Sequence, residues 1–350
     1  MQITTELFTW YSENKRELPW RNTREPYHIW LSEIMLQQTR IEQGLPYYYR
    51  FTEKYPTVFD LANAPIDEVL KLWQGLGYYS RARNLHETAK FVTEKLNGVF
   101  PKSYVELKKL KGIGDYTAAA IASFCYNEPV AVVDGNVYRV LSRLFDLDTP
   151  INSSAGIKEF KLLAQEILNK KDPATHNQAL MEFGAIQCKP QNPYCLLCPL
   201  SSKCLALRNN TVKERPIKLK KSKIKHRYFN YLVFNHQDKK TLLEQRTGKG
   251  IWNGLYQFPL VESNDHFSEK ELIASEDFKK ILGEREFEIT LFRDEPKIHK
   301  LSHQHLHTRF WIVETKLDLD KSIFINEVEK YPVPVLIENF LNEYLSEAYN

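Results

Sequence analysis

Residues 188–204 read Cys188-Lys-Pro-Gln-Asn-Pro-Tyr-Cys195-Leu-Leu-Cys198-Pro-Leu-Ser-Ser-Lys-Cys204, and this stretch decides how the chain is interpreted. It holds four of the five cysteines, and an odd total argues against a disulfide framework. Four thiolates on a short loop, which prolines keep extended, suit a tetrahedral metal or a cubane cluster. Structural zinc sites usually have two Cys-x-x-Cys pairs and this loop has one, so a [4Fe–4S] cluster is favoured, with zinc as the alternative.

The length and the charge distribution indicate how many domains the chain forms and what kind of partner it binds. A chain of 350 residues predicts two or three domains. The net charge is +4, and eight Lys/Arg with one acidic residue fall between Lys213 and Arg227. This basic stretch is either a solvated linker or a linker that lies along a phosphate backbone. Because neither a signal peptide nor an apolar run of membrane length is evident, we expect a cytoplasmic protein, bacterial in type and associated with the nucleoid.

Hydrophobic periodicity divides the chain into two kinds of structure. From Glu6 to about Leu207 the spacing predicts helices, including Tyr27–Gly44, 66–76, 81–96 and 116–124. After the basic stretch, aromatic and β-branched runs predict strands at 228–235, 241–245, 287–292 and 309–315, with one helix near 269–282. The fold class is therefore multidomain, with an all-α region followed by a smaller α+β domain.

The cysteine spacing, placed after a long helical region, resembles the endonuclease III / MutY superfamily of DNA glycosylases over roughly residues 5–207. The resemblance implies a helix–hairpin–helix core in residues 1–211, with a barrel-like six-helix part at about 22–130 and an iron–sulfur part made of 1–21 and 131–211. It implies a basic linker at 212–227 and a separate domain at 228–350. It also implies that Cys188, Cys195, Cys198 and Cys204 bind a [4Fe–4S] cluster.

A glycine turn and an aspartate match the superfamily's reactive region. Gly112 and Gly114 lie between two predicted helices, and glycine allows a backbone to approach a phosphate closely. Twenty residues after Gly114 comes Asp134, at a position that could equally be a helix N-cap. The resemblance makes Asp134 the catalytic aspartate. The superfamily's lyases carry a Schiff-base lysine where this chain has Tyr116, and a phenol cannot form an imine, so hydrolysis is expected.

A second carboxylate comes from the run Trp30-Leu-Ser-Glu-Ile-Met-Leu-Gln-Gln-Thr39, which resembles the MutY branch. That resemblance makes Glu33 the general acid, whose pKa an apolar pocket would raise, although an exposed helical glutamate would be commonplace. Asn136 and Tyr116 would support the chemistry at the sugar, and Arg21 would hold a flipped adenine. Gln178 would read the adenine edge, because an amide both donates and accepts hydrogen bonds.

Other positions resemble family contacts to DNA. An adenine must leave the base stack to be cleaved, and Gln38 and Tyr78 resemble residues that fill the vacated space. An aromatic residue beside glycines could also be a core residue. Leu36 and Thr39 resemble contacts near the opposite base.

The region after the linker resembles the MutT-like (Nudix) domain of MutY proteins in the run Gly250-Ile-Trp-Asn-Gly-Leu-Tyr-Gln-Phe-Pro259. No glycine after residue 230 has a glutamate six positions on, so the Nudix pyrophosphatase motif is absent. The run Leu301-Ser302-His303 resembles the Phe-Ser-His motif that reads 8-oxoguanine, with Leu301 departing from it. His303, His305 and His307 alternate, so on a strand they would share one face and could hold a metal or contact DNA.

These features together predict a monofunctional glycosylase that removes adenine mispaired with 8-oxoguanine or G. Its partner would be double-stranded DNA, and the protein is expected to be a monomer. The alternatives are an endonuclease III-like glycosylase/lyase, an iron–sulfur protein that binds DNA without catalysis, and a nucleotide-pool phosphatase, which the missing Nudix motif opposes.

Overall fold

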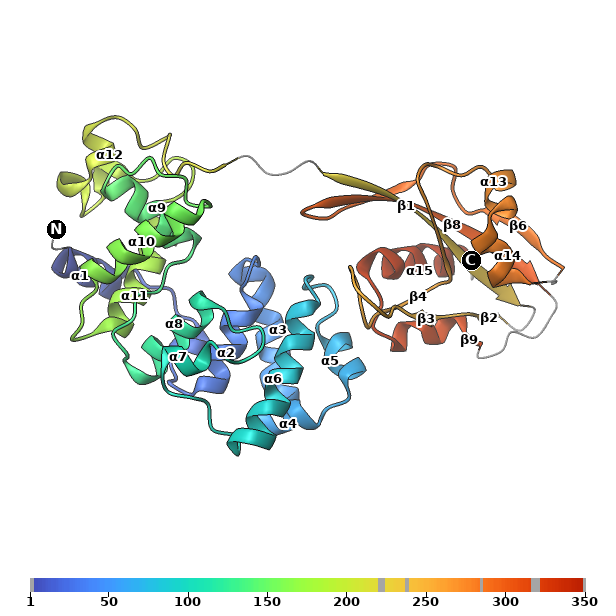
Figure 1. The fold of residues 1–350 in the computed structure, drawn as a ribbon, viewed down its shortest axis with the longest axis horizontal. Coiled ribbons are helices and arrows are strands. Elements are labelled where there is room, and N and C mark those ends of the chain that lie inside the picture. The colour runs from blue at the N-terminus through green and yellow to red at the C-terminus, as the bar shows by residue number, and fades with distance from the viewer. Residues whose placement is uncertain (1–2, 220–223, 237–238, 284–285, 316–321, 349–350) are drawn as a thin grey trace. The chain divides into compact units, whose positions relative to one another are not determined.

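The computed structural model describes residues 3–219, 224–236, 239–283, 286–315 and 322–348. The chain forms two compact units (Figure 1). The first unit contains the residues up to Asn63 and those from Asn84 into the basic stretch. The second contains Ala64–Arg83 and the residues that follow the basic stretch. No helix in the described ranges is long and apolar enough to cross a membrane.

The first unit is helical, as predicted. Its helices are α1 (Thr4–Asn14), η1 (Pro19–Arg21), α2 (Pro26–Met35), α3 (Ile41–Lys54), α4 (Val58–Asn63), most of α6 (Ser80–Leu96), α7 (Tyr104–Leu107), α8 (Asp115–Tyr126), α9 (Gly135–Leu144), α10 (Ser154–Ile167), α11 (Pro173–Glu182), the π-helical turn η2 (Phe183–Gln187), η3 (Cys195–Leu197), η4 (Ser201–Lys203) and α12 (Leu205–Arg208).

The predicted helix Tyr27–Gly44 ends earlier than the sequence indicated. Helix α2 starts with a proline at its first turn and stops at Met35, and α3 begins only at Ile41. Between them Gln38 adopts φ 56°, a left-handed conformation that cannot continue a right-handed helix. The break turns the chain back on itself directly after the helix that carries Glu33.

One core cluster of the first unit joins the N-terminal helix to residues far along the chain. Leu7 and Trp10 of α1 pack with buried side chains of α9 and α11, and the ring of Trp10 meets Phe183 edge to face at 4.9 Å. The cysteines at 188, 198 and 204 pack against the same cluster. The cysteine loop is therefore fixed to the helices that also carry Asp134 and Gln178.

The second unit is built around a mixed sheet with the order β5-β1-β8-β6, in which β7 also pairs with β8. Strands β1 and β8 run parallel, and the other pairs are antiparallel. Two further pairs, β2–β9 and β3–β4, lie outside this sheet. The strands are β1 (Lys225–His236), β2 (Lys240–Thr241), β3 (Glu244–Gln245), β4 (Tyr256–Gln257), β5 (Leu260–Ser263), β6 (Glu288–Leu291), β7 (Lys297–Lys300), β8 (Gln304–Thr315) and β9 (Ile323–Phe324).

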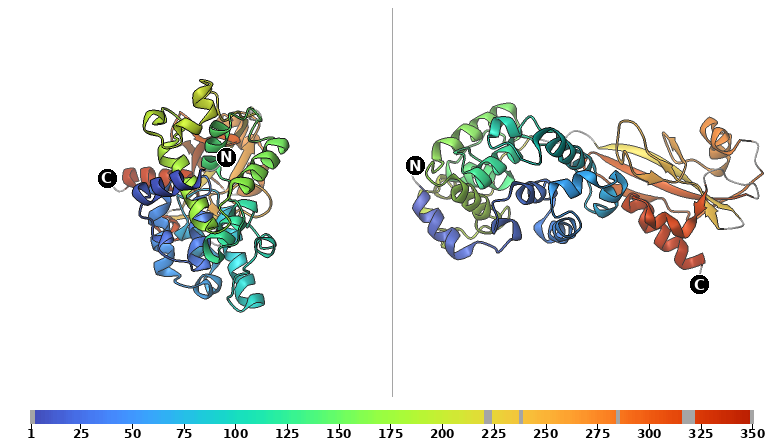
Figure 2. Two further views of the ribbon diagram at one scale, coloured as in Figure 1. Left: turned by 90° about the vertical axis from the view of Figure 1, so that its left-hand side faces the viewer. Right: turned by 90° about the horizontal axis from the view of Figure 1, so that it is seen from below.

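Helices cover both faces of this sheet. Leu272 and Phe278, from α13 (Glu269–Ala274) and α14 (Glu276–Leu282), pack against Trp311 on one face. On the other face Phe340 of α15 (Val335–Ala348) stacks on Phe310 with ring centroids 4.0 Å apart. Figure 2 shows α15, in red, lying along the sheet. The remaining elements are α5 (Ile66–Leu72) and η5 (Ile325–Lys330).

The structure corrects several expected boundaries. The helix expected near 269–282 is two helices, because Ser275 ends the first and caps the second. The strand expected at 241–245 is two short strands in different sheets. Residues at both ends of the expected linker 212–227 make defined contacts, and residues 220–223 lie outside the described residues. Arg143 Nε donates hydrogen bonds to the carbonyls of Val212 at 3.1 Å and Arg215 at 3.3 Å, and β1 begins at Lys225.

Candidate active site

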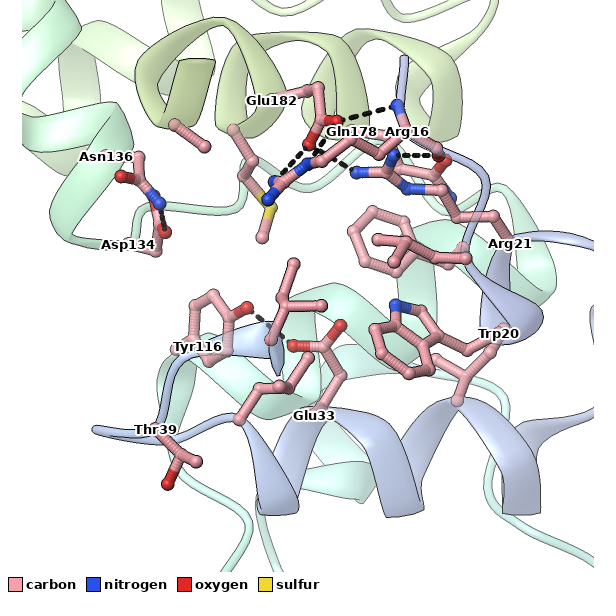
Figure 3. Close-up of a pocket in the computed structure, with 17 residues that line it drawn as sticks. Arg16, Trp20, Arg21, Glu33, Thr39, Tyr116, Asp134, Asn136, Gln178 and Glu182 are labelled. Carbon is pink, nitrogen blue, oxygen red and sulfur yellow. Dashed lines mark hydrogen bonds and ion pairs between the residues drawn. The ribbon is translucent and has the colours of Figure 1, made fainter. Parts of the chain in front are cut away.

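A small cavity of about 170 Å³ opens in the first unit, between α2, α8 and α11 (Figure 3). This volume is below the roughly 300–1,000 Å³ of typical ligand pockets, so its occupant must be small. Its lining mixes apolar side chains with three carboxyl groups and two guanidinium groups. The polar and aromatic residues among those that line it are Arg16, Trp20, Arg21, Glu33, Thr39, Tyr116, Phe124, Asp134, Asn136, Gln178 and Glu182.

Glu33 lies in the middle of α2 and is 6% exposed. The Tyr116 hydroxyl donates a hydrogen bond to Glu33 Oε2 at 2.5 Å, while the other carboxyl oxygen faces the cavity (Figure 3). Burial raises the pKa of Glu33 to about 7; the Tyr116 hydrogen bond lowers it and the charge of Asp134 raises it. A carboxyl group in this position can therefore hold a proton near neutral pH.

Asp134 is the N-cap of α9, so the structural role that its sequence position suggested is real. Its Oδ1 accepts a hydrogen bond from the Val137 backbone N–H at 2.7 Å, and its Oδ2 accepts one from Asn136 Nδ2 at 2.7 Å. Burial raises the pKa of Asp134, and these two donors together with the Arg139 charge oppose that rise. Because Asp134 also lines the cavity, one side chain both caps the helix and faces the site.

Arg139 connects this carboxylate to the cysteine loop. Its Nη2 donates to Asn136 Oδ1 at 2.9 Å and to the Gly184 carbonyl at 2.6 Å, and its Nε donates to the Cys188 carbonyl at 2.8 Å. A chain of hydrogen bonds therefore runs from Asp134 through Asn136 and Arg139 to Cys188. Sequence patterns did not indicate Arg139, because it looks like an ordinary charged residue on a helix.

Glu182 is a second residue that the sequence analysis missed. It is 1% exposed, and its carboxylate forms ion pairs with Arg16 Nη2 and Arg21 Nη2, each at 2.7 Å. The pKa of Glu182 lies near 2 because these charge-assisted hydrogen bonds outweigh the opposing effect of burial. The pair of arginines and this glutamate form one wall of the cavity, and Arg21 is held there rather than free in solvent (Figure 3).

Most of the other predicted contacts in the first unit lie at or near this cavity. Gln178 lines it and accepts a hydrogen bond from the Tyr11 hydroxyl at 2.8 Å. Leu36 and Thr39 also line it, whereas Gln38 is exposed in the left-handed turn.

The predicted glycine hairpin is present. Gly112 has φ 74°, and a Cβ there would come within 2.7 Å of Asn84 Cβ, so a larger residue is strained at this position. A Cβ at Gly114 would meet no atom within 4 Å, which leaves that backbone open to a ligand. Lys111, which precedes the hairpin glycines, pairs with Glu87 and is not among the described residues that line the cavity.

The four clustered cysteines all line one small cavity in the first unit. Arg143, which is buried, lies with Nη1 3.4 Å from Cys188 Sγ and donates to the carbonyls of Lys189 and Pro190 at 2.7 and 3.1 Å. Four thiol groups that line one cavity are the kind of ligands that a thiolate-bound metal group requires. In the described ranges no three His, Cys, Asp or Glu side chains already have the geometry of a metal site, so their side chains would still have to turn inward.

Tyr78, Ser302 and His303 belong to the second unit. Tyr78 is 49% exposed with φ 48°, and its hydroxyl lies 2.6 Å from Ser302 Oγ. His303 is exposed just before β8. Tyr78 is therefore not a core residue, which was the competing interpretation.

Comparison with known proteins supplies the family. Residues 31–165 match the family described as HhH-GPD superfamily base excision DNA repair protein, and residues 230–343 match the NUDIX domain. The adenine DNA glycosylase of Buchnera aphidicola (subspecies Baizongia pistaciae) is 37% identical over 91% of this chain and 90% of its own length. This chain belongs to the adenine DNA glycosylase family.

Solved structures resemble the helical part of this family member. A thermostable thymine-DNA glycosylase matches 59% of this chain and 94% of its own chain, with TM-score 0.55 and 30% identity. A non-covalent endonuclease III–DNA complex matches the same shares with TM-score 0.51 and 27% identity. The predicted fold class, a helix–hairpin–helix glycosylase core followed by a Nudix-like domain, is confirmed.

Proposed function

We propose that this protein is a DNA N-glycosylase that hydrolytically removes adenine paired with 8-oxoguanine or guanine in double-stranded DNA. The observation that carries the proposal is the cavity in which Glu33, hydrogen-bonded to Tyr116, and Asp134, capping α9, line one small space. Two carboxyl groups in unlike surroundings can divide acid catalysis from charge stabilisation. The named relative in Buchnera supports adenine as the base.

Glu33 takes the acid role in this proposal. Its pKa of about 7 keeps a large share of it protonated at neutral pH, and its free oxygen faces the cavity where a flipped base would lie. Protonation of adenine at N7 makes the base a better leaving group. After the base leaves, the Glu33 carboxylate can accept a proton from the water that attacks the sugar.

Asp134 takes the charge-stabilising role. It accepts two N–H donors at the N-terminus of α9, where a negative charge is favoured, whereas Glu33 accepts one hydroxyl among apolar side chains. Asp134 is therefore the member of the pair better suited to remain an anion. An anion beside the sugar lowers the energy of the cationic transition state that forms as the glycosidic bond breaks.

The alternative of a lyase is not favoured by the residues around the cavity. A Schiff base requires an amine, and the described residues that line the cavity include no lysine. Lys111, the lysine next to the hairpin, is paired with Glu87. Borohydride should therefore trap no efficient covalent complex between this enzyme and damaged DNA, and efficient trapping would overturn the hydrolytic proposal.

The cysteines at 188, 195, 198 and 204 are proposed to hold a [4Fe–4S] cluster. They line one cavity, and Arg143 fixes the backbone of the loop around it. Such a group would act as a structural clip for the loop. Arg139 donates hydrogen bonds to both the Cys188 carbonyl and Asn136 Oδ1. The conformation of the cysteine loop therefore helps to orient Asn136 at the catalytic cavity.

The experiment that tests the function is base release from three duplexes measured side by side under single-turnover conditions. The duplexes contain A:8-oxoguanine, A:G and T:G. We expect adenine release from the first two and no thymine release from the third. The T:G duplex matters because a thymine-DNA glycosylase is among the structural relatives. Release of thymine, or none of adenine, would contradict the proposal.

Recognition of the opposite base is proposed for Ser302, and the hydrogen bond between Ser302 and Tyr78 suggests a sharp test. Ser302→Ala should reduce the preference for A:8-oxoguanine over A:G by roughly fivefold, since one hydrogen bond contributes about 1 kcal/mol. Tyr78→Phe is the matched control: it removes the same Tyr78–Ser302 hydrogen bond and keeps the serine hydroxyl. Equal losses in both variants would assign the effect to that internal bond, and an unchanged preference in Ser302→Ala would exclude Ser302 as the reader.

A further inference from the structure

Four histidines form a row at one end of the sheet in the second unit. The parallel register places His226 of β1 opposite His305 of β8 and Tyr228 opposite His307, and residues two apart on a strand share a face. His266, just before α13, joins the same row. The row predicted from the sequence is therefore corrected: His303 lies before β8 begins, and His226 and His266 take part instead.

The distances between ring centroids in this row are close to those of imidazoles that share a metal ion. His226 Nδ1 lies 2.8 Å from His307 Nε2. Ring centroids are 5.1 Å apart for His226 and His307, and 5.4 Å apart both for His226 and His305 and for His266 and His307. Two imidazoles bound to one tetrahedral zinc at 2.0–2.1 Å have centroids about 5 Å apart and ligand nitrogens about 3.3 Å apart. The His226–His307 pair would need to open by only about half an ångström.

The rings of Tyr228, His226 and His266 pack around the ring of His307. Burial lowers the pKa of His307, and the charges of His226, His266 and His305 lower it further, while Asp265 opposes them. A metal ligand must be the neutral imidazole, so binding at this row should weaken as the pH falls below the ordinary histidine range. Tyr228 stacks on the His307 ring at 4.8 Å and holds its plane.

We propose that His226 and His307 bind one divalent transition-metal ion of the Zn²⁺ class, with His305 or His266 turning in as a third ligand. No three such side chains in the described residues already converge, so a rotation of one of these two rings is part of the proposal. Water would complete the coordination.

The bound ion would link β1 to β8 at the base of the Leu301–His303 loop. That base is already closed by two backbone hydrogen bonds, from Lys225 N to the His303 carbonyl at 3.1 Å and from Leu301 N to the Gln304 carbonyl at 2.8 Å. A metal bridge would therefore stiffen the loop that carries Ser302. The site does not depend on the proposed glycosylase function, because it uses none of the residues around the catalytic cavity.

The test is calorimetric titration of the full-length protein, with its iron content verified, by Zn²⁺ at pH 7.5 and pH 5.5. We expect one ion per chain at pH 7.5, binding at least about 10-fold weaker in His226→Gln and in His307→Gln, and loss of binding at pH 5.5. The matched control is His236→Gln, at the far end of β1, which should bind as the wild type does. Weaker binding in either His305→Gln or His266→Gln identifies the third ligand.

Thermal unfolding gives a second readout that does not depend on activity. Zn²⁺ should raise the unfolding temperature of the wild type and of His236→Gln, and not that of the His226→Gln/His307→Gln double variant. No binding by the wild type would show that the 2.8 Å contact is a hydrogen bond between two imidazoles and nothing more. Equal affinity in the double variant would place the ion elsewhere. Either result overturns the proposal.

Discussion

Glu33→Gln should bind adenine-containing mispairs with wild-type affinity and release adenine roughly 10²–10⁴-fold more slowly, the range that a general acid contributes. Gln keeps the shape of the side chain and can still accept the hydrogen bond that Tyr116 donates to Glu33 at 2.5 Å. It cannot deliver a proton. Single-turnover kinetics and a binding titration on the same duplex separate the two effects.

The pH dependence follows from the same carboxyl group. An acid must hold its proton, and the pKa of Glu33 is about 7, so the wild-type rate of base release should fall as the pH rises through about 7. The residual rate of Glu33→Gln should lose that limb of the profile. Glu53→Gln, at an exposed position of α3, is the control and should keep both the rate and the profile. Turnover near the wild-type rate in Glu33→Gln would remove Glu33 from the acid role.

The pH dependence of the unfolding temperature checks that Glu33→Gln is folded. The folded-state pKa of Glu33 is raised from 4.5 to about 7, so the folded protein loses stability relative to the unfolded chain as the pH rises from about 4.5 to about 7. Above that window the buried carboxylate costs on the order of 3 kcal/mol. Gln does not ionise, so Glu33→Gln should unfold at a higher temperature than the wild type at pH 8, and the difference should shrink at pH 5.

The parts of the site that could be predicted from the sequence are those with a local signal. The cysteine spacing, the glycine hairpin before Tyr116 and the apolar helix around Glu33 are each contained in a short segment. Glu182 has no such signal. Its partners Arg16 and Arg21 are more than 160 positions away in the chain, and only the folded structure brings the three charges together.

In the fold, too, the features with a local signal in the sequence were predictable and those that depend on distant contacts were not. Helix and strand types were predictable from periodicity, whereas the break at Gln38 depends on a single left-handed residue that is not a glycine. The grouping of Ala64–Arg83 with the second unit was not predictable either. It depends on long-range contacts such as the hydrogen bond that the Tyr256 hydroxyl donates to Asp67 at 3.0 Å, for which hydrophobic spacing carries no signal.

Asp134→Asn should reduce adenine release by roughly 10²–10³-fold, the loss typical of one preorganised electrostatic group, with little change in folding. Asn is as good an N-cap as Asp, so the hydrogen bond from Val137 N–H, now at 2.7 Å, can persist while the negative charge is lost. Asp172→Asn is a matched control, because Asp172 caps α11 in the same way, with Thr175 N–H at 3.2 Å, and is not among the residues that line the cavity.

The two aspartate variants separate the capping role from the catalytic one. If Asp134 acts only as a cap, both variants should have similar unfolding temperatures and similar rates of base release. If its charge stabilises the cationic sugar, only Asp134→Asn should lose rate. The remaining activity of Asp134→Asn should then still fall as the pH rises, because Glu33 continues to supply the proton. The midpoint of that fall should move to lower pH, since the charge of Asp134 is one of the causes that raise the pKa of Glu33.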